Sequence, residues 1–129
     1  MDELKDSWAP PSKISEKIRS RIKKDNARYH ANDNISKYIE PGELEQLQEE
    51  VKEKLQGVLE SLVIDTENDH NTQDTAKRVA KMYVKETFGG RYSPMPRVTS
   101  FPNMGYKSMY TSGPISIKST CAHHLQNIV

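Results

Sequence analysis

The sequence has one cysteine, one tryptophan and no long apolar run, and these absences exclude whole classes of protein. A single cysteine cannot form an intrachain disulfide, so a disulfide-stapled scaffold is excluded and the reducing cytoplasm is the expected location. No apolar stretch approaches the roughly 18 residues of a membrane span, so no membrane partner is expected. The N-terminus opens Met-Asp-Glu-Leu-Lys-Asp, which does not have the pattern of a signal peptide.

The chain also lacks an excess of either charge, with 19 basic and 18 acidic side chains and a net charge of +1. No overall field attracts it to nucleic acid, so nucleic acid is not an expected partner. Its 129 residues allow one domain at most, and an apolar content of 34% is low for a compact domain. Part of the chain is therefore expected to remain unpacked.

Residues 1–40 are predicted to be this unpacked part, a flexible N-terminal extension. Pro10-Pro11 interrupts regular structure, and Ile14, Ile18 and Ile22 then recur every four residues among basic side chains. That spacing allows a short amphipathic helix, which could dock on an acidic partner or a membrane surface. Three isoleucines bury little area, so the sequence favours a solvated extension.

Two helices are predicted after Pro41-Gly42. The first follows from apolar residues that step by three or four: Leu44, Leu47, Val51, Leu55, Val58 and Leu62. This stripe is too short for a stable coiled coil and favours one face of a helix on a globular core. The second begins near Asp74-Thr75, whose oxygens can cap free N–H groups, and ends at Gly89-Gly90 in a left-handed conformation.

The second helix is expected to have a buried face and a basic face. The buried face consists of Ala76, Val79, Ala80, Tyr83 and Phe88. The basic face consists of Lys77, Arg78, Lys81 and Lys85. Such a face is usually a solvated surface, and the alternative is a binding site for phosphate.

Strands are predicted beyond Arg91. Three prolines exclude helix at the start of this region: Pro94, Pro96 and Pro102. Residues 104–111 and 115–119 have the pattern of an antiparallel hairpin joined at residues 112–114, and residues 125–129 could add a strand. Helices followed by strands predict an α+β fold.

The candidate chemistry lies in the motif Ser-Thr-Cys-Ala-His-His at residues 119–124. Thiolate and imidazole are ligands that zinc prefers, and a catalytic site leaves one position to water. The spacing of Cys121 and His124 lets both turn toward one ion, so they are the predicted zinc ligands. His123 is placed as a general acid or base because histidine titrates near neutrality. Zinc can lower the pKa of bound water to about 7.

The alternative is a structural cysteine, because a lone buried cysteine is more often part of a core than a ligand. A three-ligand site that uses Cys121 and His124 also needs another donor. Within the sequence, the available donors are His123, His30, His70 and carboxylates.

Two segments resemble GTP cyclohydrolase I. Residues 119–124 are similar to the Ser-Thr-Cys-Glu-His-His signature of that family, with Ala122 in place of the glutamate. Residues 74–83 resemble its Thr-Pro-x-Arg-x-Ala-Lys-Met-Tyr helix, with Ala76 in place of the proline. The resemblance covers about residues 43–129, so it implies that residues 41–129 are the N-terminal part of a GTP cyclohydrolase I domain.

The resemblance implies a cytoplasmic, zinc-dependent enzyme that opens the imidazole ring of GTP at C8. Members of this family release formate and form 7,8-dihydroneopterin triphosphate, the first step toward tetrahydrofolate and other pterins. The implied fold is the tunnel fold, assembled as a toroidal homodecamer with active sites between subunits. Cys121 and His124 then correspond to zinc ligands, His123 to the histidine of the proton transfers, and Arg78 to an arginine that faces the triphosphate.

The second cysteine ligand of the family, its guanine-binding glutamate and most triphosphate-binding residues have no match here. We therefore expect the fold to be incomplete on its C-terminal side. A second interpretation is a catalytically inactive short homologue that acts as an interaction or regulatory subunit of GTP cyclohydrolase assemblies. A third is another tunnel-fold purine or pterin enzyme, although those usually lack the Cys-x-His-His pairing.

Overall fold

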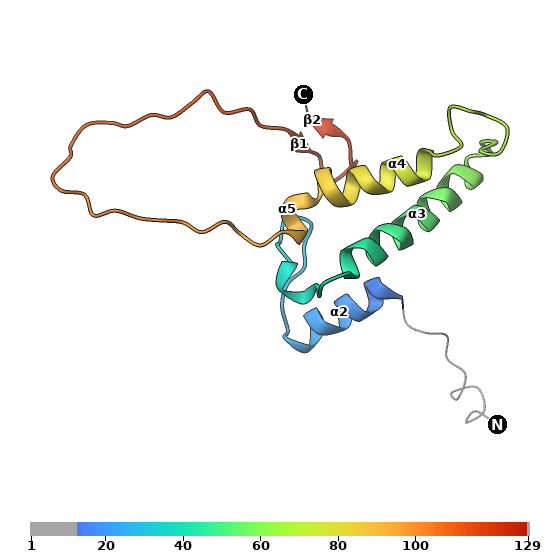
Figure 1. The fold of residues 1–129 in the computed structure, drawn as a ribbon, viewed down its shortest axis with the longest axis horizontal. Coiled ribbons are helices and arrows are strands. Elements are labelled where there is room, and N and C mark those ends of the chain that lie inside the picture. The colour runs from blue at the N-terminus through green and yellow to red at the C-terminus, as the bar shows by residue number, and fades with distance from the viewer. Residues whose placement is uncertain (1–12, 129) are drawn as a thin grey trace. The chain divides into compact units, whose positions relative to one another are not determined.

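The computed structural model describes residues 13–128, and the chain divides into two compact units at Pro94 and Met95. The first unit is helical (Figure 1). It contains α2 (Ile14–Lys24), the 3-10 turn η1 (Ser36–Tyr38), α3 (Glu43–Ser61), α4 (Thr75–Met82), the π-helical turn η2 (Tyr83–Thr87) and α5 (Gly89–Tyr92). The second unit contains the two short strands β1 (Ser119–Thr120) and β2 (Asn127–Ile128). Among residues 13–128, no helix is both long and apolar enough to cross a membrane.

The helix α2 packs into the core of the helical unit. Its three isoleucines at four-residue spacing belong to a buried cluster that the η1 region and α3 complete: Ile14, Ile18, Ile22, Ile35, Tyr38 and Leu47. The amphipathic helix in the sequence is therefore present. The expectation of a flexible, solvated extension is wrong for residues 13–40, because the isoleucines bury apolar area together with partners from other elements. Residues 1–12, which include Pro10-Pro11, lie outside the described part.

A buried ion pair fastens α2 to the start of α3. The Arg21 guanidinium donates to both carboxylate oxygens of Glu43, and its Nη1 also donates to the Tyr38 carbonyl at 2.9 Å. Glu43 is only 8% exposed. The hydrogen bond from Arg21 lowers the pKa of Glu43 to about 2, so the carboxylate is charged throughout the physiological range.

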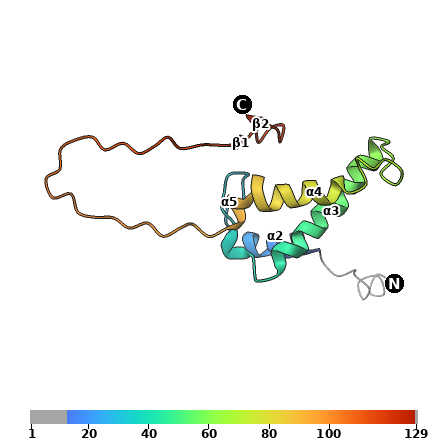
Figure 2. The ribbon, with the colours of Figure 1, turned by 45° about the horizontal axis from the view of Figure 1, so that its top comes forward.

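The helices α3 and α4 lie side by side as a hairpin (Figure 2). The predicted first helix is confirmed, since α3 begins directly after Gly42, whose φ of 84° suits glycine. The second helix begins at Thr75 as predicted, but the Asp74 side chain makes no capping hydrogen bond. Ala76 and Ala80 are buried as expected, together with Val84.

The predicted end of the second helix is wrong in its geometry. Gly89 and Gly90 do not have positive φ, and they begin α5 instead of ending a helix. The chain leaves α4 through the wider η2 turn, in which the Phe88 N–H donates to the Tyr83 carbonyl at 2.8 Å. Because this five-residue step redirects the chain, no left-handed glycine is needed there.

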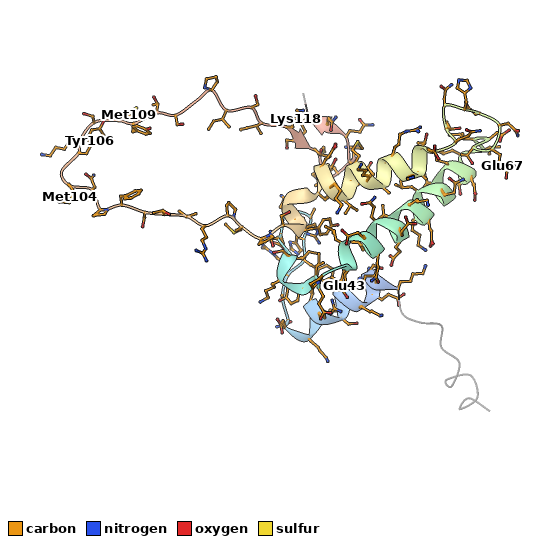
Figure 3. All side chains as sticks on the ribbon, viewed as in Figure 1. Glu43, Glu67, Met104, Tyr106, Met109 and Lys118 are labelled. Atoms are coloured by element: carbon orange, nitrogen blue, oxygen red, sulfur yellow. The ribbon has the colours of Figure 1, made fainter. Side chains whose placement is uncertain are left out.

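The second unit has far less regular structure than predicted. Residues 93–118 contain no helix, as the prolines indicated, but they also contain no strand, so the predicted hairpin is wrong. Met104, Tyr106 and Met109 lie on this extended segment (Figure 3), and Met104 and Met109 are 90% and 88% exposed. An isolated hairpin buries too little to be stable unless another element covers one face.

The small sheet forms close to the chemistry-bearing motif. β1 and β2 pair antiparallel, with Ser119 opposite Ile128 and Thr120 opposite Asn127. The expected strand at residues 125–129 is thus confirmed at 127–128, and Val129 lies outside the described residues. Helices followed by an antiparallel pair confirm the α+β class.

Candidate functional site

A tight turn between β1 and β2 holds the Cys-Ala-His-His motif. The Cys121 N–H donates to the Gln126 carbonyl, and the Leu125 N–H donates to the Cys121 carbonyl, both at 2.7 Å. Leu125 closes the turn in the left-handed region, with φ of 55°. Because the N–H and the carbonyl of Cys121 are both hydrogen-bonded, the backbone fixes the position of its Cβ atom.

The turn brings the three predicted site residues together. The Cys121 Sγ lies 3.9 Å from the His123 Nδ1 and 3.9 Å from the His124 Nδ1. Cys121 is half-buried, and both histidines are exposed to solvent. The equal distances do not by themselves distinguish His124 as the ligand from His123 as the acid or base.

The arrangement fits a zinc ion in donor type and in spacing. Zinc–sulfur and zinc–nitrogen bonds of about 2.3 and 2.0 Å at a tetrahedral angle separate S from N by about 3.5 Å. The observed 3.9 Å is within a few tenths of an ångström of that separation. Cys121 and His124 could therefore hold one ion after a small adjustment of their side chains.

The described part of the chain does not supply a complete site. Across residues 13–128, no group of three His, Cys, Asp or Glu side chains is placed to hold a metal ion. His30 and His70, the other histidines considered from the sequence, both belong to the helical unit. Ala122 is exposed and brings no carboxylate to the turn.

Arg78 lies on α4, in the helical unit, and is described apart from the Cys121 turn. It is exposed, and its Nη2 donates to the Asn71 carbonyl at 3.0 Å and to the Thr75 Oγ1 at 3.3 Å. Among the residues that the structure describes, no carboxylate forms an ion pair with Arg78. Its charge therefore remains available to an anion from solvent.

Sequence reasoning missed a second group of polar residues in the helical unit. Arg19 and Arg91 line a pocket together with Tyr29 and Tyr92. The isoleucine stripe of α2 was the one available signal, because it predicts which face of that helix turns inward. The partners on that face are distant in sequence, so the pattern alone could not identify them.

The comparisons with known proteins identify the family. A protein-family model described as GTP cyclohydrolase I matches residues 51–129. The protein named GTP cyclohydrolase 1 from Shewanella baltica is 36% identical over 86 residues, which are 65% of this chain and 39% of the relative. Its namesake from Flavobacterium johnsoniae is 37% identical over 83 residues, 63% of this chain and 37% of the relative.

Other relatives agree with these two. GTP cyclohydrolase 1 from Shewanella loihica is 38% identical over 82 residues, 62% of this chain and 38% of the relative. The chain thus spans about two fifths of the length of the curated relatives it matches. No solved structure gives a significant match.

Proposed function

Because the chain belongs to the GTP cyclohydrolase I family, we propose that it works as part of a zinc-dependent GTP cyclohydrolase I. The reaction would open the guanine imidazole ring of GTP at C8, release formate and give 7,8-dihydroneopterin triphosphate, the first step toward tetrahydrofolate. The observation that carries this proposal is the gathering of both histidine rings around the Cys121 Sγ, within the matched segment.

In this proposal, Cys121 and His124 hold the zinc ion. A zinc ion in this position would supply an activated water for hydrolysis. His123 keeps its ring free of the metal and moves protons at the guanine ring nitrogen that becomes an amine. An exposed imidazole suits that role because one ring nitrogen can accept a proton while the other donates one.

The Arg78 guanidinium is proposed to bind the triphosphate, across a subunit boundary. Its charge is not neutralised by a carboxylate within the described residues, and its planar fork matches phosphate oxygens. Only the Nη2 atom is used by the protein in the described structure, so the Nη1 and Nε groups remain free to donate.

The proposed assembly is a cytoplasmic homodecamer with the tunnel fold. A catalytic zinc takes three protein ligands, and Cys121 with His124 supplies two. The third donor must therefore come from outside this pair, which favours a site that other polypeptide segments complete. The exposed apolar side chains between Met95 and Ile117 also favour further packing in the assembly.

The proposal is tested by zinc content and GTP turnover of the protein in its natural assembly. We expect Cys121→Ser and His124→Ala to lose zinc and product together, and His123→Ala to keep zinc but lose product. Arg78→Lys should raise KM for GTP more than it lowers kcat. His70→Ala, which changes an exposed histidine of the helical unit, is the matched control and should change neither quantity.

Wild-type product formation by Cys121→Ser would contradict this assignment. The second candidate is an inactive interaction subunit, which the lack of a three-donor group within residues 13–128 favours. In that case the chain would co-purify with a full-length GTP cyclohydrolase 1 and add no turnover per zinc.

A further inference from the structure

The helical unit contains a pocket of about 190 Å³ between α2, the 29–35 loop and α5. Its lining combines a helix face, two aromatic rings and two arginines: Ser15, Ile18, Arg19, Ile22, Tyr29, Ile35, Leu47, Arg91 and Tyr92. Most of these residues precede residue 51, where the family match begins. Neither Arg78 nor any residue of the Cys121 motif lines the pocket.

The floor of the pocket is apolar and well ordered by packing. Ile18, Ile22, Ile35 and Leu47 are between 2% and 8% exposed. All four belong to the central cluster of the helical unit. A ligand that enters the pocket would therefore meet hydrocarbon below it.

The edge of the pocket carries positive charge without a neutralising carboxylate. Arg91 donates from Nη1 and Nη2 to backbone carbonyls, including those of Tyr29, at 3.3 Å, and Asp33, at 2.8 Å, and among the described residues it forms no ion pair. Arg19 is exposed, and within residues 13–128 it forms no ion pair. Backbone carbonyls hold the Arg91 guanidinium in place, but they are uncharged and do not neutralise its positive charge.

The two carboxylates near the pocket, those of Glu50 and Asp33, already accept hydrogen bonds from other groups. The Glu50 carboxylate accepts the Ser15 N–H at 3.1 Å, and it does not line the pocket. The Asp33 carboxylate binds the Arg28 guanidinium through two hydrogen bonds of 2.8 Å. Burial raises the pKa of Tyr92, so its phenol stays neutral and adds no negative charge.

We propose that this pocket binds a small anion with a flat apolar body, of the aromatic carboxylate class. The ring would lie on the isoleucine floor, and the carboxylate would bind Arg19 and the free donors of Arg91. Size favours this class, because a cavity of about 150 Å³ accommodates benzene. Typical pockets for larger ligands begin at about 300 Å³, so a nucleotide does not fit.

The test uses benzoate as the probe, added to the full 129-residue chain and followed by amide NMR shifts. We expect saturable shifts at Ser15, Ile18 and Ile35 with a Kd of about 1 mM, as nine non-hydrogen atoms allow. Benzyl alcohol, which has the ring without the charge, should bind at least tenfold more weakly. Inorganic phosphate, which has the charge without the ring, should also bind at least tenfold more weakly.

Variants of Arg19 test the contact itself, because this exposed side chain can change without disturbing the core. Arg19→Gln should weaken benzoate binding at least fivefold, and Arg19→Lys should retain most of it. Lys24→Gln removes a charge from the last turn of α2 without touching the pocket, and it should have no effect. Equal weakening by Lys24→Gln, equal binding of phosphate, or no saturable shift at 10 mM benzoate, about ten times the expected Kd, would overturn the proposal. No GTP assay enters this test, so its outcome is independent of the proposed cyclohydrolase activity.

Discussion

The helical unit and the segment from Met95 to Ile128 are held in shape by different interactions. In the helical unit, the buried apolar residues come from α2, the 3-10 turn, α3 and the α4 region. In the second segment, every residue from Met95 to Ser119 is exposed, and only Thr120 and Cys121 are half-buried. Packing therefore shapes the first unit, and a few hydrogen bonds shape the second.

The stable core and the residues of the proposed zinc site therefore lie in different units. Cys121, His123 and His124 lie in the segment that has no core of its own, on a turn fixed by two hydrogen bonds of 2.7 Å. A turn of that kind opens locally at low free-energy cost, whereas a precise catalytic site needs surrounding groups that hold it. The proposed zinc site would therefore depend on further packing around this turn.

The same substitution placed in each unit gives the largest expected contrast. Ile22 is 2% exposed and Ile117 is 84% exposed. We expect Ile22→Ala to lower the free energy of unfolding by about 2–5 kcal/mol, because it removes buried area and leaves a cavity. Ile117→Ala should change it by less than about 0.5 kcal/mol. Urea denaturation followed by helical circular dichroism measures both.

If Ile22→Ala is largely unfolded, Ile22→Val can replace it in the same urea measurement. It should cost about 0.5–1.5 kcal/mol, since it removes one methylene. Equal losses in the free energy of unfolding at positions 22 and 117 would contradict the view that packing stabilises only the helical unit.

The buried ion pair gives the next largest effect. Glu43→Gln leaves Arg21 without its charged partner and should cost about 1–3 kcal/mol at pH 7. The pKa of Glu43 is lowered from 4.5 to about 2, so the stabilisation is complete above about pH 4.5 and is lost as the pH falls toward 2. The wild type and the variant should therefore approach each other in urea midpoint between these pH values.

Glu53→Gln is the matched control for this experiment, because Glu53 is exposed on the same helix. It should change the urea midpoint little at any pH. A constant difference between Glu43→Gln and the wild type from pH 7 to pH 2 would contradict the ion-pair explanation.

The arginine that fastens the 29–33 loop should matter less. Arg91 donates to the carbonyls of His30, Ala31 and Asp33, among others. We expect Arg91→Lys to cost about 1–2 kcal/mol, because an ammonium group cannot form the same fork of hydrogen bonds. Arg97→Lys, in the exposed segment, is the control and should be neutral. Equal urea midpoints for the two variants would sink this explanation.

The sequence correctly predicted those features of the structure that depend on residues close together in the chain. The apolar stripe of Leu44, Leu47 and its successors correctly gave α3, and the prolines correctly excluded helix after Tyr92, where α5 ends. The short spacing of Cys121, His123 and His124 was enough to predict that they meet, because one turn contains all three. The zinc ion, the role of His123 and the role of Arg78 stay predictions.

The errors involve partners that are distant in sequence. The burial of α2 depends on Ile35, Tyr38 and Leu47, which no periodicity within residues 14–22 reveals. The two strands predicted within residues 104–119 were to pair with each other, but a lone hairpin is stable only when another element covers one face, and residues 104–118 are all exposed. Sequence patterns therefore predicted the elements better than their contacts.

The smallest predicted effect compares the C-terminal ends of α2 and α3, which share one hydrogen-bond pattern. After α3, the Val63 N–H donates to the Glu60 carbonyl and the Ile64 N–H to the Leu59 carbonyl, at 2.9 and 3.1 Å. This Schellman motif favours glycine or asparagine at the left-handed position. The same position after α2 is Asn26, with φ of 50°, whereas after α3 it is Val63, with φ of 61°.

Val63 is a β-branched residue in the left-handed region, and 91% of it is exposed, so it contributes strain and almost no packing. We expect Val63→Gly to raise the free energy of unfolding by about 0.5–1 kcal/mol, because the relief of strain exceeds the added backbone entropy of the unfolded chain. Leu62→Gly is the control: its φ of −78° is ordinary for any residue, so glycine there should be destabilising. A lower urea midpoint for Val63→Gly than for the wild type would mean that the end of α3 is held by something other than this turn.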